Sequence, residues 1–341
     1  MRTFSHVAGL ASTVILGALF LSATSARAQA VYEYAPSATG AYSGVAIATD
    51  GGIRYSEYGT SEIGEFKSGH TVLPLVTPTL DAGPDSMALG PDGNIWFLEL
   101  KAGKLARINP DRSITEEPLP CSPSAALYNS GDALWFAEQC RGYEELVRVA
   151  PGGSLSHYVI SSGNAVIWGI VKGPDGNIWF TEFGSNKIGR LDLSGPYLTE
   201  FAIPTAVSEP SFIVLGGDGK LWFQEDHPPL KVASIDIAHG GLIVEYDWPD
   251  TVLPQTLIAG ADGNFWTIDA MKRVWRFSID DGAVNRIQIP SKQNDVMILG
   301  IALAANGDIW FSEDRSSGGN SALGLIRMDG IFNDDLEPPL P

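Results

Sequence analysis

The chain has 341 residues, and its 40 acidic against 22 basic side chains give a formal net charge of −18 at neutral pH. This excess of negative charge argues against nucleic acid or an anionic membrane surface as a partner. The 38 glycines and 22 prolines are typical of a chain with many tight turns. We therefore expect a globular, monomeric, all-β protein.

The first 28 residues have the three parts of a secretory signal peptide. Arg2 precedes an apolar stretch over residues 7–21, and Ala26-Arg27-Ala28 fits the small-x-small pattern of a cleavage site. The apolar stretch is short and interrupted for a bilayer span, so we expect cleavage and no membrane span afterwards; the alternative is an uncleaved anchor. Export predicts a periplasmic or secreted protein, in which disulfides can form.

A repeating unit fills the rest of the chain. Residues 173–191, GPDGNIWFTEFGSNKIGRL, give its clearest copy: a tight turn around Gly176, a strand with the pair Trp179-Phe180, and an acid, Glu182. Asp, Gly and Asn at the turn suit a β-hairpin. The tryptophan position recurs at intervals of 39 to 44 residues, at Arg54 (a degenerate copy), Trp96, Trp135, Trp179, Trp222, Trp266 and Trp310.

Seven copies with a period of roughly 40–45 residues predict a β-propeller with seven four-stranded blades. In the fourth copy we expect strands over residues 166–172, 178–182, 187–193 and 198–204. The outer-strand pattern of residues 198–204 also occurs in residues 31–35, ahead of the first innermost strand. This N-terminal strand should therefore complete blade seven and remove its free sheet edge.

The repeats also define the domain organisation. Length alone favours two domains as a soft prior, but the seven copies use the whole mature chain. We predict a signal peptide over residues 1–28, a single propeller domain over residues 29–332, and a flexible C-terminal tail over residues 333–341.

The only two cysteines should form a disulfide. Cys121 lies in the loop between the second and third copies, and Cys140 follows the second strand of the third copy. Loops of these two kinds emerge on the same face of a propeller. We expect Cα atoms roughly 4.4–6.8 Å apart.

The second strand of every copy ends in an acid, and we expect these side chains on the face that carries the second-to-third-strand loops. They are Glu57, Glu99, Glu138, Glu182, Glu225, Asp269 and Glu313. Such a ring could bind Mg²⁺ or Ca²⁺ and present an acidic face to a small-molecule or polymer substrate. Alternatively, the acids are structural and accept hydrogen bonds from the next blade or pair with recurring arginines such as Arg190.

Histidine is the side chain best suited to act as a base near neutral pH. Among the histidines of the mature chain, only His227 lies in a loop on the acidic face. It is a candidate catalytic base; the alternative is a solvated loop residue.

The stretch DGNIWFTEFGSNKIGRLDLSG, with LTEFAIPT after it, resembles the repeat of the virginiamycin B lyase family. The resemblance covers nearly all of residues 31–330. It implies a seven-bladed propeller and a Mg²⁺-dependent carbon–oxygen lyase that opens a cyclic depsipeptide by elimination at its ester. Enzymes of that family carry Glu-Pro-His at the start of one innermost strand, a Glu at the end of the next strand, and a second His in the preceding blade.

The fifth copy matches this pattern best. Glu209-Pro210 is followed by Ser211 in place of His, and Glu225 stands 14 residues after Ser211. The resemblance implies that Glu209 and Glu225 hold Mg²⁺, with His227 as the base. Trp168 falls where the second His would lie, and the corresponding positions of the last two copies hold Gln255 and Leu299. The substrate would contact Trp168, Glu182 and Ser211.

Three functions therefore stay open. The first is a lyase that opens a cyclic ester, and the second is a non-enzymatic propeller that binds a ligand or a protein. The third is a lactonase-type metal-dependent hydrolase, although no Glu, Asn and Asp set for its metal can be located in the sequence.

Overall fold

The structure of this protein is a computed structural model. It describes residues 31–34, 42–67, 70–124, 127–160, 163–195, 197–251, 256–260, 262–269, 273–280, 282, 284–288, 297–314 and 322–327. The expected signal peptide and C-terminal tail lie outside the described residues, and both stay predictions.

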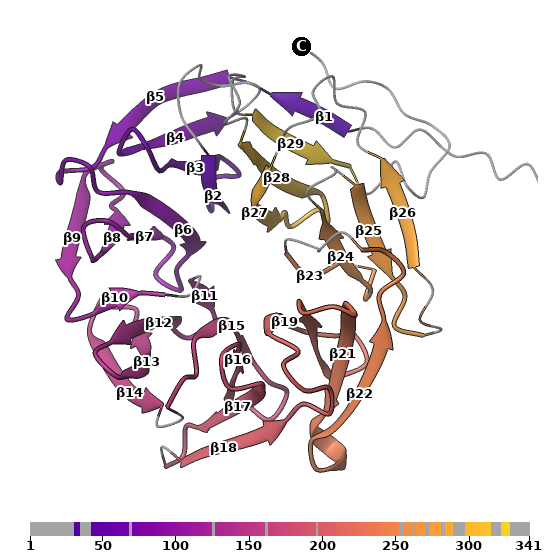
Figure 1. Cartoon of the computed structure of the whole chain (residues 1–341). Helices are drawn as coiled ribbons and strands as arrows, with labels where there is room; N and C mark the ends of the chain where they lie inside the picture. The colour runs from indigo at the N-terminus through magenta and orange to yellow at the C-terminus, as the bar shows by residue number, and fades with distance from the viewer. Residues whose placement is uncertain are drawn as a thin grey trace, which may run out of the picture.

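The described strands form seven antiparallel sheets arranged in a ring (Figure 1). In six of them the chain runs from the centre outward, and in the seventh the outermost strand comes from the N-terminal end of the described chain. The predicted seven-bladed all-β propeller is confirmed. Within the described ranges the one helical element is the 3-10 turn η1 (Ile237–His239). No helix in this part of the chain has the length and apolarity needed to cross a bilayer.

The first four blades take up the N-terminal half of the ring. Blade one contains β2 (Tyr42–Ile47), β3 (Ile53–Glu57), β4 (Glu62–Lys67) and β5 (His70–Val76). Blade two contains β6 (Pro84–Leu89), β7 (Ile95–Glu99), β8 (Lys104–Ile108) and β9 (Ile114–Pro118). Blade three contains β10 (Ser122–Pro123), β11 (Tyr128–Asn129), β12 (Leu134–Cys140), β13 (Tyr143–Val149) and β14 (Leu155–Ile160). Blade four contains β15 (Ile167–Lys172), β16 (Ile178–Glu182), β17 (Lys187–Asp192) and β18 (Tyr197–Ala202).

The last three blades complete the ring. Blade five contains β19 (Pro210–Leu215), β20 (Leu221–Glu225), β21 (Lys231–Asp236) and β22 (Leu242–Asp247). Blade six contains β23 (Ile258–Ala259), β24 (Phe265–Ile268), β25 (Arg273–Phe277) and β26 (Val284–Gln288). Blade seven contains β27 (Met297–Leu303), β28 (Ile309–Asp314), β29 (Ala322–Ile326) and β1 (Val31–Tyr34).

The N-terminal strand closes the propeller. β1 pairs antiparallel with β29, with Val31 opposite Ile326 and Tyr34 opposite Leu323. The first strand of the chain is therefore the outer strand of the last blade, as the sequence predicts. Because this strand covers the edge of β29, the ring is held together by backbone hydrogen bonds between the two ends of the described chain.

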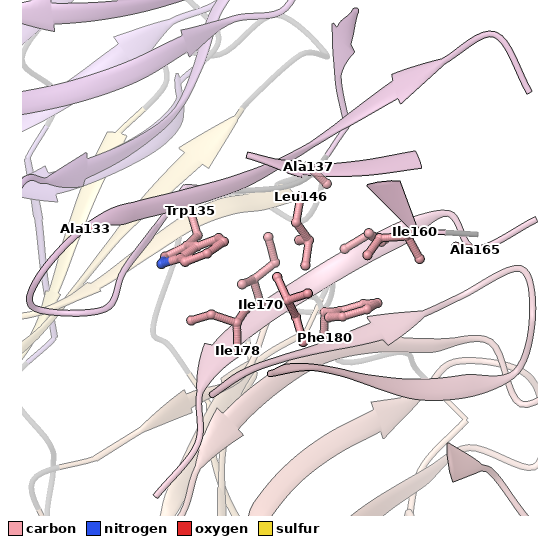
Figure 2. Packing of buried hydrophobic residues seen from close by; sticks show 11 residues of the cluster. Ala133, Trp135, Ala137, Leu146, Ile160, Ala165, Ile170, Ile178 and Phe180 are labelled. Carbon is pink, nitrogen blue, oxygen red and sulfur yellow. The ribbon is translucent and has the colours of Figure 1, made fainter. Parts of the chain in front are cut away.

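The core lies between adjacent blades. Figure 2 shows Trp135 and Leu146 of blade three packing against Ile170 and Phe180 of blade four. Trp179, on the other side of blade four, packs in turn against blade five. Of the tryptophans at the repeat position, Trp310 is partly buried and the others are buried, namely Trp96, Trp135, Trp179, Trp222 and Trp266.

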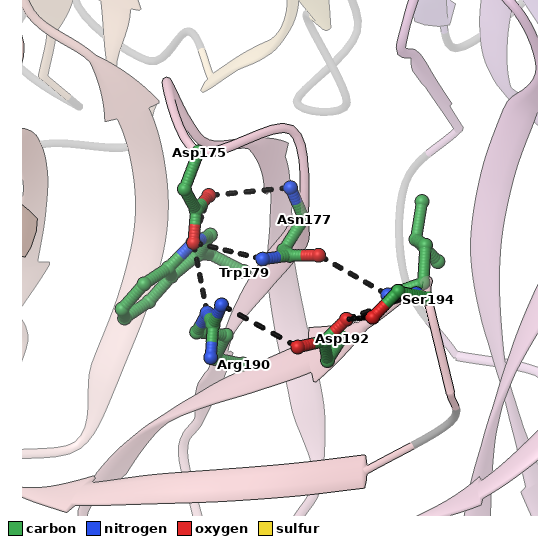
Figure 3. Close-up of polar contacts among 7 residues, drawn as sticks. Asp175, Asn177, Trp179, Arg190, Asp192 and Ser194 are labelled. Carbon is green, nitrogen blue, oxygen red and sulfur yellow. Dashed lines mark hydrogen bonds and ion pairs between the residues drawn. The ribbon is translucent and has the colours of Figure 1, made fainter.

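A turn motif sets the start of strand β16 (Figure 3). Asp175 accepts hydrogen bonds from the backbone N–H of Asn177 at 3.2 Å and from Nε1 of Trp179 at 3.0 Å. Its other oxygen accepts from Nε of Arg190 at 2.8 Å. The positive φ of Gly176, 81°, lets the chain reverse at this point. One carboxylate thus connects the turn to strands β16 and β17.

Most of the innermost strands have a β-bulge near their start. In β19 the register shifts between Pro210 and Ile213, and in β15 it shifts between Ile167 and Ile170. An extra residue in a bulge bends the strand and redirects a side chain. The bulges of β15 and β19 contain Trp168 and Ser211 respectively, two of the predicted site residues.

Candidate functional site: the central cavity

The innermost strands of all seven blades enclose a cavity of about 720 Å³. Apolar side chains dominate its wall, among them Met87, Ile170, Ile213 and Ile258. Among the described residues that line it, Asp85 has the one carboxyl side chain, and Tyr128 adds a phenol. A mostly apolar cavity with few polar groups is the usual form of a small-molecule site.

Asp85 lies in the bulge of β6 and is held by blade one. Ser56 donates a hydrogen bond of 2.8 Å from its hydroxyl to the backbone oxygen of Asp85, and Ser43 donates one of 3.2 Å to the backbone oxygen of Pro84. Burial raises the pKa of Asp85, against a smaller lowering by the hydroxyl of Ser43. The cavity therefore contains a carboxyl group that accepts a proton more readily than an exposed aspartate does.

Trp168 gives the cavity wall an accessible aromatic surface. Its ring stacks on Phe183 at a centroid distance of 5.5 Å and meets the edge of Phe212 at 6.3 Å. Trp168 and Phe212 both line the cavity, yet 44% of the Trp168 surface stays exposed. Because these rings already hold each other in place, a ligand can stack on them without a further loss of side-chain conformational freedom. The substrate-contacting role of Trp168 stays a prediction.

Next to the cavity, the start of β19 brings two acids together. The backbone N–H of Asp226 donates a hydrogen bond of 3.2 Å to the backbone oxygen of Glu209. Burial raises the pKa of Asp226 to about 7; the hydroxyl of Ser211 lowers it and the charge of Glu209 raises it. Sequence reasoning missed Asp226. The signal available was its place directly after the strand-ending acid, where blades two and four have Leu100 and Phe183.

The strand-ending acids whose side chains the structure describes are buried, namely Glu57, Glu99, Glu138, Glu182, Glu225 and Asp269. Glu225 is buried, and burial raises its pKa to about 7; the charge of Glu245 raises it further, and that of Lys231 lowers it. Lys231 itself is 2.9 Å from Glu245. Glu182 is also buried and accepts a hydrogen bond of 2.6 Å from Ser185. The structural alternative expected arginine partners, but Arg190 pairs with Asp175 and Asp192. The role of the strand-ending acids stays a prediction.

The disulfide prediction is confirmed. Cys121 and Cys140 are bonded to each other, and their Cα atoms are 5.0 Å apart. The bond joins the segment before β10 to the end of β12 and so fixes the inner part of blade three.

The relatives of the chain agree with this architecture. A sequence model of the virginiamycin B lyase family matches residues 22–225 and 123–334, which together cover most of the chain. The chain belongs to the virginiamycin B lyase family.

Individual members of the family are distant from this chain. A virginiamycin B lyase of Nocardia farcinica (strain IFM 10152) is 28% identical over 175 residues, or 51% of this chain, and the match spans only 60% of that relative's length. Selenomethionine-substituted virginiamycin B lyase of Staphylococcus aureus is 25% identical with a TM-score of 0.76, covering 88% of this chain and 99% of its own. A streptogramin B lyase structure is 24% identical with a TM-score of 0.75, covering 87% and 97%, and shows the shared fold.

The virginiamycin B lyase resemblance assigned Mg²⁺ to Glu209 and Glu225. In this structure the charge of Glu209 acts on Asp226, whereas the charges that act on Glu225 come from Glu245 and Lys231. Among the described residues, Glu209 and Glu225 do not belong to a group of three or more ligand atoms within 4.8 Å of one another, so we derive no metal step through this pair. The Mg²⁺ assignment stays a prediction.

The structure places His227, the predicted virginiamycin B lyase-type base, in the loop after β20. Its side chain is exposed, and its Nδ1 lies 3.1 Å from the backbone oxygen of Pro228. Its backbone N–H donates to the backbone oxygen of Ser208 at 3.1 Å. Ser211 is completely buried. The roles of both residues stay predictions.

Proposed function

We propose that the protein binds a small, mostly apolar cyclic peptide or ester in the central cavity. The observation that carries this proposal is the cavity itself. Its volume of about 720 Å³ lies in the range that suits drug-sized ligands, and its wall is mostly apolar. Trp168 and Phe212 supply stacking surface, and Asp85 supplies a carboxyl group that can form hydrogen bonds and accept a proton.

Family membership favours a second step, the opening of the bound ring by elimination. In this reaction a base removes the proton on the carbon next to a carbonyl. The electron pair forms a carbon–carbon double bond, and the ester oxygen leaves as a carboxylate. The linear product has the same mass as the cyclic substrate, because no water is added.

Asp226 is our first candidate for this base, because burial raises its pKa to about 7, a value that suits proton transfer near neutral pH. It follows Glu225, which pairs with Pro210 at the start of β19, and it does not itself line the cavity. His227, in the same loop, is the alternative base, as predicted from the sequence. A bound Mg²⁺ would polarise the ester carbonyl, but the roles given to Asp226 and His227 do not depend on it.

We also propose that the protein works in a periplasm or outside the cell. The Cys121–Cys140 disulfide supports this location, because such bonds persist in oxidising compartments.

Quinupristin is a suitable probe, because a catalytically inactive His-to-Ala variant of S. aureus virginiamycin B lyase was solved with it; that structure is 24% identical to this chain and has a TM-score of 0.75. We expect quinupristin to change the tryptophan fluorescence of the full chain with saturation. Trp168→Ala should weaken binding at least about tenfold, as loss of a central aromatic contact does. Tyr197→Ala is the control, since this exposed tyrosine lies on the outer strand of the same blade.

Mass spectrometry of the quinupristin reaction separates the hypotheses. A linear product of unchanged mass supports elimination, and loss of this product in Asp226→Asn or His227→Ala identifies the base. A product heavier by one water supports the lactonase-type alternative. Saturable binding without turnover supports the alternative of a non-enzymatic propeller that binds a ligand. No saturable binding by the wild-type chain contradicts the proposed site.

A further inference from the structure

Three blades share an arrangement of charges on their outer strands. In each, the acid that ends the second strand lies opposite a lysine that starts the third strand, and a glutamate follows on the outer strand. The sets are Glu99, Lys104 and Glu116 in blade two, Glu182, Lys187 and Glu200 in blade four, and Glu225, Lys231 and Glu245 in blade five. The lysine forms an ion pair with the outer glutamate in all three, for example at 2.6 Å in blade two and 2.9 Å in blade five. Each of these three blades thus contains a permanent cation, the ammonium group of its lysine.

Blade three departs from this arrangement at both partner positions. Glu138 lies on β12, two residues before its end at Cys140, and is opposite Glu145, which takes the lysine position. His157 on β14 lies opposite Val147, the register position that Glu116 has opposite Ala106 in blade two. The three side chains are therefore two carboxylates and one imidazole, and this set lacks the permanent cation of blades two, four and five.

The three side chains converge. Nδ1 of His157 is 3.0 Å from Oε2 of Glu145 and 3.9 Å from Oε2 of Glu138. One ligand atom from each of the three lies within 4.8 Å of the other two. Four-coordinate Zn²⁺ with bonds near 2.0–2.1 Å needs ligand atoms about 3.4 Å apart. The two observed distances bracket that value, so small side-chain rotations would bring all three atoms into coordination.

Glu138 has both carboxylate oxygens buried without a hydrogen-bond partner, and none of its surface is exposed. The oxygens of Glu99 and Glu225 also have none, and burial raises the pKa of each to about 7 as well, but a lysine faces each of them, Lys104 and Lys231 respectively, and its charge opposes that rise. For Glu138, burial raises the pKa to about 7 and the charge of Glu145 raises it further. A buried carboxylate aimed at a second carboxylate is unfavourable unless a cation lies between them.

We propose that Glu138, Glu145 and His157 bind a divalent transition metal ion, with Zn²⁺ as the metal that this donor set fits best. Imidazole nitrogen with carboxylate oxygen suits zinc and its neighbours, whereas Mg²⁺ and Ca²⁺ prefer oxygen ligands throughout. The ion reaches the site from the outer edge of the blade, where 32% of the His157 side chain is exposed, and water fills the fourth position.

The metal takes the place that the lysine has in the other blades and ties strands β12, β13 and β14 together. The site lies outside the central cavity and is independent of the proposed function. Cys121 and Cys140 also lie close to Glu138, but their sulfur atoms are bonded to each other and are not available as ligands in the oxidised protein.

Calorimetric titration of the full, oxidised, EDTA-treated chain with Zn²⁺ tests the site. We expect about one tight site per chain, a rise in Tm on adding Zn²⁺, and at least about a tenfold loss of affinity in His157→Ala. His239→Ala is the matched control, because this histidine makes a 2.9 Å contact with Asp236 but is exposed and lacks a second acid in its contacts. It should leave the affinity unchanged.

A second variant distinguishes loss of the metal site from misfolding of the chain. Glu145→Lys combined with His157→Glu restores the charges of blades two, four and five, so it should fold, bind no Zn²⁺ tightly, and show no Zn²⁺-dependent rise in Tm. The proposal is overturned if wild type binds no Zn²⁺, if His157→Ala or this double variant binds it as tightly as wild type, or if His239→Ala removes the binding.

Discussion

Nε1 of Trp179 donates a hydrogen bond of 3.0 Å to Oδ1 of Asp175, four residues earlier in the chain. The same bond joins the corresponding residues of three other blades, namely Trp96 to Asp92, Trp222 to Asp218, and Trp266 to Asp262. In blade three the aspartate, Asp132, stands only three residues before Trp135, and the indole nitrogen of Trp135 is buried without a partner. The spacing of four residues in the repeat therefore has a physical cause, because it lets a turn carboxylate reach the buried indole.

Replacing Asp175 with alanine should destabilise the protein. The change leaves the Trp179 N–H without its acceptor and also removes the bond from Arg190, and a buried unsatisfied donor costs about 1–3 kcal/mol. Chemical denaturation measures the loss. Asp111→Ala is the control: Asp111 is exposed and accepts only from Ser113, so its removal should cost less than about 0.5 kcal/mol. Equal losses in the two variants would contradict this account of the motif.

Removing the disulfide should lower stability by roughly 3 kcal/mol, the value expected for a closed loop of this size. The sequence separation of Cys121 and Cys140 is 19 residues. The double change Cys121→Ser and Cys140→Ser, compared with wild type by denaturation without reductant, tests the magnitude. Alkylation of the unreduced wild-type protein should find no free thiol; modification of both cysteines would show that the bond does not form.

Deleting residues 31–34 should open the ring. Without β1, the edge of β29 is exposed, and unpaired edges promote association between chains. We expect a lower Tm and larger species by light scattering. A monomeric deletion variant with the Tm of the full chain would mean that closure by β1 contributes nothing to stability.

Stability should fall as the pH rises from about 5 to about 8, because buried acids must ionise in that range. Burial raises the pKa of Glu99 to about 7 from an ordinary value of 4.5, with a further rise from the charge of Glu116 and a lowering by Lys104. Between these two pKa values the folded protein binds the proton and the unfolded chain does not, so this contribution to stability is complete below the lower value and lost above the higher one. Acids with lowered pKa values, such as Asp175, titrate below this window.

Thermal unfolding of Glu99→Gln across the same pH range measures this contribution. The neutral amide has no proton to lose, so the fall in Tm between about pH 5 and pH 8 should be smaller than in wild type. A fall of the same size in both proteins would exclude Glu99 as a source of the pH dependence.

The fold could be predicted from the sequence because its determinants are local. The turn at Asp175 and the pair Trp179-Phe180 recur with an almost constant period, and the blade-closing strand has the same pattern as other outer strands. The disulfide followed from the same reasoning, since the loops of a propeller alternate between its two faces. Each of these inferences needed only the order of the strands within one blade.

The candidate site could be predicted only in part. Trp168, predicted from the sequence as a substrate contact, lies on the cavity wall, and its role stays a prediction. The bulges near the start of the innermost strands leave no clear mark in the sequence. Asp85 and Asp226 were missed, because their pKa shifts come from burial by neighbouring blades. The Glu138 and His157 pair is visible only once the strand register shows which residues of different strands lie side by side.

The most direct test of the cavity as the functional site is a crystal structure of the full chain with quinupristin. We predict that the ligand occupies the central cavity, with apolar groups against Trp168 and Phe212 and a polar group within hydrogen-bond distance of Asp85. Ligand density elsewhere on the propeller, or an empty cavity in crystals that contain a saturating concentration of the compound, would contradict the central claim.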